Sequence, residues 1–434
     1  MPGLRFRLRS QNRDISGNGV RQVRIWQRLL GLRQVVVESV ELVDDGAGQV
    51  LVVGVRRRER SVGRCGRCGV RASGYDRGGG VRRWRHLDFG AVRVELVADA
   101  PRVNCATHGP TVLAVPWARH GSRFTTAFED TCVWLAARTA ASTVVALMRT
   151  SWRAVTAMVA RVVAGEGRDR LAGLRRIGID EIAYRKGQRY LTVVIDHDSG
   201  ALVWAREGRN KSAVLAFFDQ LGPDRAAELT HVSADGAEWI ATAVSERAPQ
   251  AIRCMDPYHV IAWASDALDQ VRKQVWNAAR GGPGQRNETS RILKGARWAL
   301  WKKPERLTDA QQATLATIQA TNKPLYRAYL LKEQLREVIA VKGEAGRLLL
   351  AGWLRWAGRS RLAPFVKLAR TIRSHLPEIH NTLHCGLSNG RIEANNTHLR
   401  LLTRQAYGYH SAQALIAMAM LRRGGLCPTL PGRS

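Results

Sequence analysis

An aspartate in the middle of an otherwise apolar strand is the feature of this sequence that most constrains its fold. Residues 177–182 and 190–196 have the composition of two β-strands, and Lys186-Gly187 between them has the chemistry of a tight turn. Asp180 lies within the first strand, among Ile and Gly residues. Because an ionised carboxylate in a buried strand is costly unless a cation meets it, we predict that Asp180 binds a divalent metal.

The charge balance is the second constraint. The 434 residues include 68 Lys and Arg but only 36 Asp and Glu, for a net charge of +32. Such an excess suits a long polyanion, through phosphate neutralisation and counterion release. A genome rich in arginine codons would explain the arginines, but not the shortage of acids.

A membrane role is disfavoured by the same sequence. No single amphipathic basic helix stands out, no apolar run is long enough to span a bilayer, and the N-terminus shows no signal-peptide pattern. An odd number of cysteines, seven, argues against a disulfide framework. We therefore expect a cytoplasmic protein associated with the nucleoid and with no membrane partner.

Two pairs of metal-ligand residues, each separated by two residues, lie in the N-terminal third of the chain. They are Cys65 with Cys68, and Cys105 with His108. This is the knuckle spacing of a tetrahedral Zn²⁺ site, and four protein ligands would make the zinc structural rather than catalytic. The alternative is that His108 is an ordinary turn residue and that the cysteines are free.

Helical periodicity then runs from residue 124 to residue 163. It predicts one helix at 124–138, a short helix with Ser142 as its N-cap, and a helix at 152–163 with Ser151 as its N-cap. A short helix, a tight turn and a second helix form a helix-turn-helix pattern, which any small helical bundle also resembles. The position between a basic zinc ribbon and a metal-binding core favours DNA binding.

Three residues near the start of the last helix in this pattern would face the major groove of DNA. They are Trp152, Arg153 and Thr156.

From residue 175 the pattern becomes α/β. Three strand segments are followed by alternating helices and strands, which is the order of a ribonuclease-H-like fold. Residues 288–385 have only helical patterns, so we predict an all-helical insertion into this core, with a separate helical domain as the alternative.

The predicted fold class is therefore multidomain α+β: an N-terminal zinc ribbon, a helix-turn-helix, and a ribonuclease-H-like α/β catalytic core interrupted by an all-helical insertion. The predicted boundaries are a basic tail at 1–20, a zinc-binding ribbon domain at 21–115, a helix-turn-helix DNA-binding domain at 116–170, the first part of the core at 171–280, the insertion at 281–388, C-terminal core helices at 389–425 and a tail at 426–434.

Phosphodiester chemistry explains why several carboxylates would converge in such a core. Two metal ions about 3.5–4 Å apart clamp the attacking and leaving oxygens, and Mg²⁺ prefers carboxylate oxygens. We select Asp180, Asp235 and Glu393 as ligands of two Mg²⁺ or Mn²⁺ ions. Asp235 alternatively caps a helix, and Glu393 is alternatively a first-turn glutamate favoured by the helix dipole. Asp256 is the main rival for the second ligand, or else it caps a helix while His259 packs under the site.

The other acids near Asp180 are weaker candidates. Glu181 must point to the opposite face of the strand, so we expect it to be structural or to face DNA. Asp196 and Asp198 precede Ser199-Gly200 and are expected to form a turn.

Several sequence blocks resemble those of bacterial insertion-sequence transposases of the ISL-three family, over about residues 22–425. The blocks are GIDE at 178–181 with YLTVVIDHDSGALVW after it, VSADGAEW at 232–239, DPYHV at 256–260, SNGRIEANNTHLRLLTRQAYGYH at 388–410, CATHG at 105–109 and PWARHGSRFT at 116–125. The last two resemble the family's zinc ribbon and the entry to its helix-turn-helix.

The resemblance implies a DDE transposase in which Asp180, Asp235 and Glu393 are the catalytic, metal-binding triad. Arg400 matches a basic residue that DDE enzymes often place near transposon-end DNA, and Arg404 shares its helical face.

The segment from Cys254 to His259 resembles the C/D-x-x-H signature of several eukaryotic DDE groups. Asp256 and His259 are therefore candidate accessory residues.

The expected function is that of a transposase which binds terminal inverted repeats, nicks the transposon end with metal-activated water and joins the freed 3′-hydroxyl to target DNA. The expected partners are double-stranded DNA, as terminal repeats and target, and further copies of the chain, because two ends must be brought together in a homodimer or a larger assembly. The alternatives are a catalytically silent transposase-derived DNA-binding regulator and a structure-selective nuclease of the same fold. The three carboxylates argue against the first, and the zinc ribbon with its helix-turn-helix argues against the second.

Overall fold

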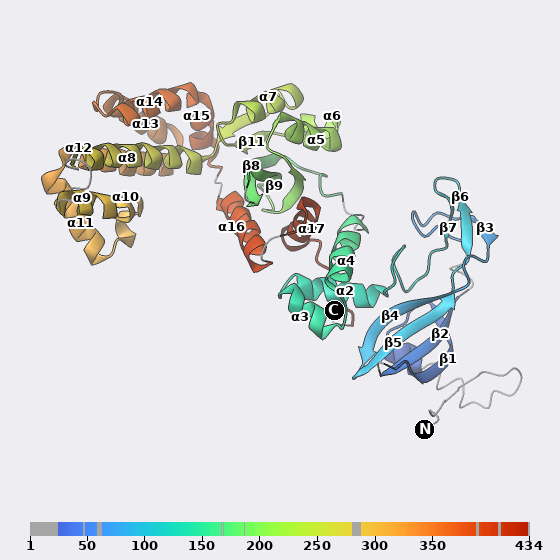
Figure 1. Cartoon of the computed structure of the whole chain (residues 1–434). Coiled ribbons are helices and arrows are strands. Elements are labelled where there is room, and N and C mark those ends of the chain that lie inside the picture. The colour runs from blue at the N-terminus through green and yellow to red at the C-terminus, as the bar shows by residue number, and fades with distance from the viewer. Residues whose placement is uncertain are drawn as a thin grey trace, which may run out of the picture. The chain divides into compact units, whose positions relative to one another are not determined.

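The computed structural model describes residues 25–46, 48–58, 63–165, 167, 169–185, 187–279, 288–387, 390–406 and 409–432. The chain forms two compact units, one comprising Met1–Gly167 with Leu426–Ser434 and the other Arg168–Gly425 (Figure 1). The predicted basic tail at 1–20 lies outside the described residues. No helix in the described part of the chain is long and apolar enough to cross a membrane.

The first unit contains a four-stranded sheet in the order β1-β2-β5-β4, preceded by a short helical segment at residues 25–29. The first two strands form an antiparallel hairpin. Their apolar side chains pack with Trp84 and Trp117, whose rings meet edge to face. The strands are β1 (Val35–Asp44), β2 (Gln49–Arg57), β4 (Val81–Phe89) and β5 (Val92–Asp99).

The two ligand pairs lie at and around a smaller three-stranded sheet. Its order is β3-β6-β7, from β3 (Ser73–Asp76), β6 (Arg102–Cys105) and β7 (Gly109–Val112). Its buried apolar cluster is small and includes two of the cysteines themselves, with Val103 and Leu113. So small a core gives little hydrophobic stabilisation, which is the usual reason for a structural metal.

Three helices follow as the helical period predicts: α2 (Thr126–Ala136), α3 (Ala141–Leu147) and α4 (Trp152–Gly165). Ser151 caps α4 by accepting a hydrogen bond from the backbone N of Ala154 at 3.2 Å. The prediction that Ser142 caps the preceding helix is wrong: Ala140 occupies the cap position without a side-chain hydrogen bond.

The second unit contains a five-stranded sheet in the order β10-β9-β8-β11-β12. The first three strands along the chain pair antiparallel, and β11 then pairs in parallel with both β8 and β12. The strands are β8 (Arg176–Arg185), β9 (Arg189–Asp196), β10 (Leu202–Glu207), β11 (His231–Ala234) and β12 (Ile252–Met255).

Helices cover both faces of this sheet (Figure 1). On one face α5 (Lys211–Leu221) and α7 (Glu238–Arg247) share a core with Ile177 and Ile179. On the other lie α16 (Gly390–Gln405) and α17 (Ala412–Arg423). Gly178 allows the close approach of α16, because a Cβ at this position would lie 2.2 Å from Ile392 Cδ1. A short helix that the sequence reading missed, α6 (Pro223–Ala227), follows α5.

The long helix α8 leads from the sheet into a body of helices with its own hydrophobic core. The described residues between α8 and α16 contain helices and no strand, as the sequence predicts. The elements are α8 (Pro257–Ala279), α9 (Glu288–Gly295), α10 (Arg297–Trp301), η2 (Pro304–Arg306), α11 (Asp309–Thr321), α12 (Lys323–Ala340), α13 (Gly343–Gly358), α14 (Ala363–Ser374) and α15 (Leu376–Cys385).

Candidate functional site

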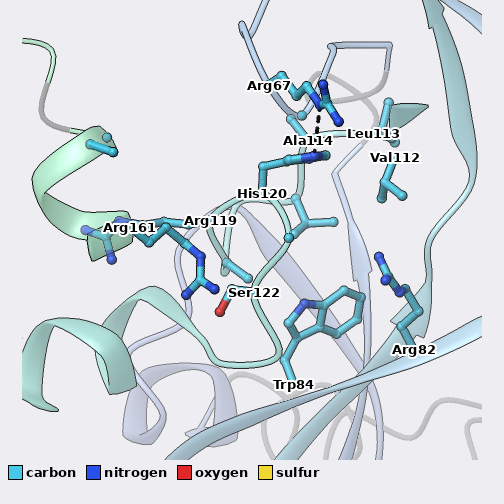
Figure 2. Close-up of a pocket in the computed structure, with 16 residues that line it drawn as sticks. Arg67, Arg82, Trp84, Val112, Leu113, Ala114, Arg119, His120, Ser122 and Arg161 are labelled. Atoms are coloured by element: carbon cyan, nitrogen blue, oxygen red, sulfur yellow. Dashed lines mark hydrogen bonds between the residues drawn. The ribbon is translucent and has the colours of Figure 1, made fainter. Parts of the chain in front are cut away.

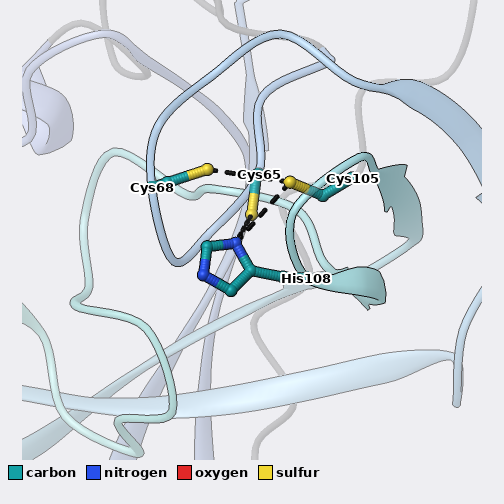
Figure 3. A group of neighbouring side chains, drawn as sticks. All are labelled: Cys65, Cys68, Cys105 and His108. Carbon is teal, nitrogen blue, oxygen red and sulfur yellow. Dashed lines mark hydrogen bonds between the residues drawn. The ribbon is translucent and has the colours of Figure 1, made fainter.

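The four predicted zinc ligands come together in the first unit. Cys65 and Cys68 lie on the loop before β3, Cys105 ends β6 and His108 lies in the turn to β7. Their sulfur and nitrogen atoms all lie within 4.8 Å of one another. Figure 3 shows the side chains pointing toward one common point.

The distances within this cluster match a tetrahedral zinc site. Cys68 Sγ lies 3.7 Å from Cys105 Sγ, and His108 Nδ1 lies 3.7 Å from Cys65 Sγ and 3.6 Å from Cys105 Sγ. A regular tetrahedron with Zn–S of about 2.3 Å and Zn–N of about 2.0–2.1 Å places its sulfurs about 3.8 Å apart and sulfur and nitrogen about 3.6 Å apart.

The acidity of Cys105 also suits zinc, which binds the thiolate. The hydrogen bond to His108 is the main cause that lowers the pKa of Cys105 to about 6. The donor set therefore fits a structural zinc ion.

In the second unit, strand register places three aspartates in one row. Ser233 of β11 pairs with Gly178 of β8, and Ala234 pairs with Met255 of β12. Continuing both registers brings Asp235 level with Asp180 on one side and with Asp256 on the other.

This row lies at the carboxyl ends of β11 and β12, the edge where open α/β sheets bind ligands. Two of its aspartates, Asp180 and Asp235, were predicted as metal ligands. The third, Asp256, was predicted as the rival of Asp235.

Asp180 is held by hydrogen bonds to both carboxylate oxygens. Its Oδ1 accepts from the backbone N of Glu181 at 2.6 Å, and its Oδ2 accepts from Asn396 Nδ2. Burial is the main cause that raises the pKa of Asp180, Asp235 acts in the same direction, and the two hydrogen bonds and His259 act against it. A carboxylate in this environment is stabilised by a cation.

Asp256 directly precedes helix α8, and Asp235 lies in the turn before helix α7. Asp235 Oδ1 accepts from the backbone N of Ala237 at 3.1 Å, just before α7, and Asp256 Oδ1 accepts from the backbone N of Tyr258 at 2.8 Å, at the start of α8. Asp256 Oδ2 lies 3.6 Å from His259 Nε2. The predicted cap by Asp256 is therefore present, whereas the predicted cap by Asp235 is wrong, because Ala237 occupies the cap position of α7 without a side-chain hydrogen bond. Both interactions are compatible with metal binding, because each backbone N–H engages only one oxygen of the carboxylate.

Glu393 lies exposed in the first turn of α16, one turn before Asn396. The hydrogen bond of Asn396 to Asp180 places this face of α16 against β8. Arg391 anchors the same turn by donating to the carbonyl oxygens of His197 and Asp198.

The predicted triad is not at metal-ligand distance. Among the described residues, the zinc cluster is the only group of three or more Cys, His, Asp or Glu whose ligand atoms lie within 4.8 Å of one another. Asp180 and Asp235 are close enough to influence each other electrostatically, whereas Glu393 is brought only to the same side of the sheet.

One residue of this site, Asn396, was not predicted. Asn396 contacts Asp180, and its own Oδ1 is buried without a hydrogen-bond partner. Glu181, which was expected to be structural or to face DNA, is nearly buried and paired with Arg209, and its Oε1 is buried without a hydrogen-bond partner. Burial, reinforced by Asp235, raises the pKa of Glu181 to about 7. Asn396 lies three residues after Glu393, on the same face of α16, and this spacing is the sequence signal that could have identified it.

The residues predicted to contact DNA all lie on exposed helix surfaces. Trp152, Arg153 and Thr156 are exposed on α4, and Arg400 and Arg404 are exposed on α16. Trp152 is 53% exposed, which is unusual for a tryptophan without a partner surface.

Three family models match this chain, in the order of its domains. Residues 61–108 match the zinc-finger of transposase IS204/IS1001/IS1096/IS1165, residues 113–163 match the helix-turn-helix domain of transposase family ISL3, and residues 177–419 match a transposase domain of the DDE type. The class of protein is therefore a transposase with a zinc ribbon and a DNA-binding helix-turn-helix.

The chain belongs to the ISL3 family of insertion-sequence transposases, as its sequence blocks predict. It is 54% identical over 436 aligned positions to the transposase for insertion sequence element IS1557 of Mycobacterium tuberculosis, covering 95% of this chain and 98% of that protein. It is 27% identical over 394 positions to the transposase for insertion sequence element IS1001 of Bordetella parapertussis, covering 90% and 95% respectively.

Proposed function

We propose that this chain is a metal-dependent transposase that binds the terminal inverted repeats of its own element, cleaves DNA at the element's ends and transfers the freed 3′-hydroxyl to target DNA. The observation that carries the proposal is the row of aspartates at the carboxyl ends of parallel strands, with α16 packed against the same strands. Family membership and the basic charge of the chain support DNA as the substrate.

The second unit is proposed to be a ribonuclease-H-like core. Three antiparallel strands, two further parallel strands and helices on both faces support this assignment. The helices from α9 to α15 would then be an insertion between α8 and α16.

Asp180, Asp235 and Glu393 are the proposed ligands of two Mg²⁺ or Mn²⁺ ions. When bound, such ions neutralise the phosphate and activate the attacking oxygen. Asn396 and the backbone N of Glu181 fix the orientation of the Asp180 carboxylate.

Arg400 has a proposed role in holding DNA. It lies about two helical turns after Glu393 on the exposed face of α16, where a guanidinium can bind a DNA phosphate. Arg404 continues the same face.

DNA recognition is assigned to the first unit. The start of α4, with Trp152, Arg153 and Thr156, would enter the major groove of the terminal repeat. Because two ends must be joined, the active form is proposed to be a dimer or a larger assembly on DNA.

The test is cleavage of a plasmid that carries the element's own ends, with Asp180→Asn, Asp235→Asn and Glu393→Gln. Each is expected to lose about a thousandfold or more of its cleavage rate while binding the end duplex like wild type. Asp219→Asn is the matched control, because Asp219 forms a surface ion pair with Arg247 on the α5–α7 side. Wild-type cleavage by all three variants would overturn the proposal.

The same assay assigns the second ligand. Full activity of Asp235→Asn combined with loss of activity in Asp256→Asn would transfer that role to Asp256, which shares its row.

A further inference from the structure

A basic cavity lies in the first unit, away from the exposed start of α4. It has a volume of about 480 Å³ and is lined by the zinc knuckle, by β4, by residues 112–115 and 118–122 and by the last turn of α4. Figure 2 shows Arg67 and His120 on one side, Arg82 on another, and Arg119 with Arg161 on a third. Among the described residues that line it, none is acidic.

Two of these five basic side chains are already neutralised. Glu129 is completely buried, and its carboxylate accepts hydrogen bonds from Ser122, Arg119 and Arg161. Arg119 also pairs with Asp130 at 2.8 Å. Arg119 and Arg161 therefore serve to satisfy a buried carboxylate of α2 and to hold the cavity wall in place.

The remaining positive charge is not compensated within the described residues. Arg67 and Arg82 are exposed and have no carboxylate partner in the described part of the chain. Partial burial, then the charges of Arg67 and Arg82, lower the pKa of His120. Two guanidinium groups and an imidazole thus face this space, and no carboxylate of the described residues lines it.

The zinc knuckle fixes the position of Arg67. The backbone N of Arg67 donates to Cys65 Sγ at 3.4 Å, and its Nε donates to His120 Nε2 at 3.4 Å. Glycine is required at position 66, between Cys65 and Arg67. A Cβ there would lie 2.5 Å from the carbonyl oxygen of Val112 and 2.7 Å from His120 Nδ1. Residues of the zinc knuckle and of the helix-turn-helix therefore line the same cavity.

We infer that this cavity binds a phosphate group of the DNA backbone through Arg67, Arg82 and His120, so that the zinc ribbon and the helix-turn-helix hold one duplex. Guanidinium groups bind phosphate through paired N–H donors, and such contacts fix the register of a protein on DNA. The inference rests on the proposed DNA-binding function of the first unit and adds a second point of contact to it.

The dimensions of α4 agree with a single duplex. Trp152 and Arg161 are nine residues apart, about 14 Å along the helix, which is well within one turn of B-DNA of about 34 Å. The C-terminal end of α4 also lines the cavity, and the helix dipole gives it a partial negative charge of about half a unit. This charge is smaller than the combined positive charge of Arg67 and Arg82.

The test measures the affinity of the full, zinc-loaded chain for an end duplex and for a scrambled duplex over a range of salt concentrations. Arg67→Gln and Arg82→Gln are each expected to weaken binding to both duplexes by about three- to tenfold and to reduce the salt slope by about one. Arg83→Gln is the matched control, because Arg83 lies on the neighbouring position of β4 and pairs with Glu95 at 3.0 Å. Zinc content is measured for every variant.

Inorganic phosphate distinguishes a DNA phosphate from a free anion. It is titrated against the wild-type chain without DNA at constant ionic strength. Wild-type affinity and salt slope in both variants would overturn the inference, and phosphate binding in that case would identify a free-anion site instead.

The proposed recognition of the terminal repeat and the proposed phosphate site are overturned by different results. If wild type binds both duplexes equally, recognition of the terminal repeat fails, while the variants still test the cavity on either duplex. If wild type binds neither duplex, both proposals are overturned.

Discussion

The zinc cluster and the row of aspartates are both candidate metal centres, yet the chain builds them differently. The zinc ligands come from two short local pairs, and their atoms already have the spacing of a tetrahedron. The carboxylates come from three strands and a distant helix, and no three of them, among the described residues, have ligand atoms within 4.8 Å of one another. A metal that holds a small fold together is coordinated by a preformed site, whereas carboxylates that repel one another are brought together by the metal and substrate they bind.

This difference predicts opposite effects on stability, and the largest is expected at the zinc site. Cys105→Ser should reduce the zinc content from one ion per chain toward zero, because a structural zinc contributes on the order of 10 kcal/mol to folding. Hydrogen exchange should show loss of protection in β3, β6 and β7, with the second unit unchanged. Cys385→Ser, in the second unit, is the control. Retained zinc and retained protection in Cys105→Ser would remove the contrast between the two centres.

At the aspartate row, loss of a charge should leave the fold as stable or make it more stable. We expect Asp180→Asn, in buffer without divalent ions, to raise the free energy of unfolding of the second unit by up to about 1–2 kcal/mol, or a few degrees in Tm. Rotation of the Asn396 amide can present its unpaired Oδ1 to the new amide. Thermal unfolding of wild type and of Asp180→Asn measures the difference in Tm. A strongly destabilised Asp180→Asn would mean that Asp180 has a structural role like that of the cysteines.

The pH dependence of stability provides a third comparison. The pKa of Glu181 is raised to about 7 in the folded chain from an ordinary value of 4.5. The folded state therefore holds this proton more tightly, so stability should fall as pH rises from about 4.5 to about 7 and then level off, by on the order of 1 kcal/mol. Denaturant unfolding of wild type and Glu181→Gln at pH 5 and pH 8 tests this. An equal pH effect in both proteins would exclude Glu181 as its source.

The smallest effect is expected at the turn beside the row. Asp198 pairs with Arg176 on the surface, and both side chains are largely exposed. Asp198→Asn should therefore change the free energy of unfolding by less than about 1 kcal/mol and leave cleavage within about twofold of wild type. A large loss of cleavage would place a third acid of this hairpin in the active site.

Local patterns in the sequence were sufficient for many of the elements and for the zinc ligands, but not for α6 or for the short strands β3, β6 and β7. The ligand spacing of Cys65 and Cys68, the strand composition at residues 177–196 and the period of α4 each depend on neighbouring residues only. The turn chemistry of Asp196 was also predicted, and its carboxylate accepts from the backbone N of Asp198 and of Ser199 at 3.0 Å.

Features that depend on pairing between distant segments were not predicted. The position of Asp256 beside Asp235 follows from the register of β11 and β12, which hydrophobic pattern alone does not fix. The contact of Asn396 with Asp180 requires α16 to pack on β8. The cavity at Arg67 depends on the loop of Val112 and His120 folding back onto the zinc knuckle.

We propose that Asp180, Asp235 and Glu393 form one metal site on assembly with DNA, in addition to the zinc cluster. Fe²⁺ in place of Mg²⁺, with ascorbate and peroxide, cuts the backbone next to its ligands, and the fragments are mapped by mass spectrometry in the complex with end DNA. We expect cuts near residues 180, 235 and 393 that excess Mg²⁺ suppresses and that Asp180→Asn abolishes. Cuts confined to other segments, or unchanged in Asp180→Asn, would contradict the account.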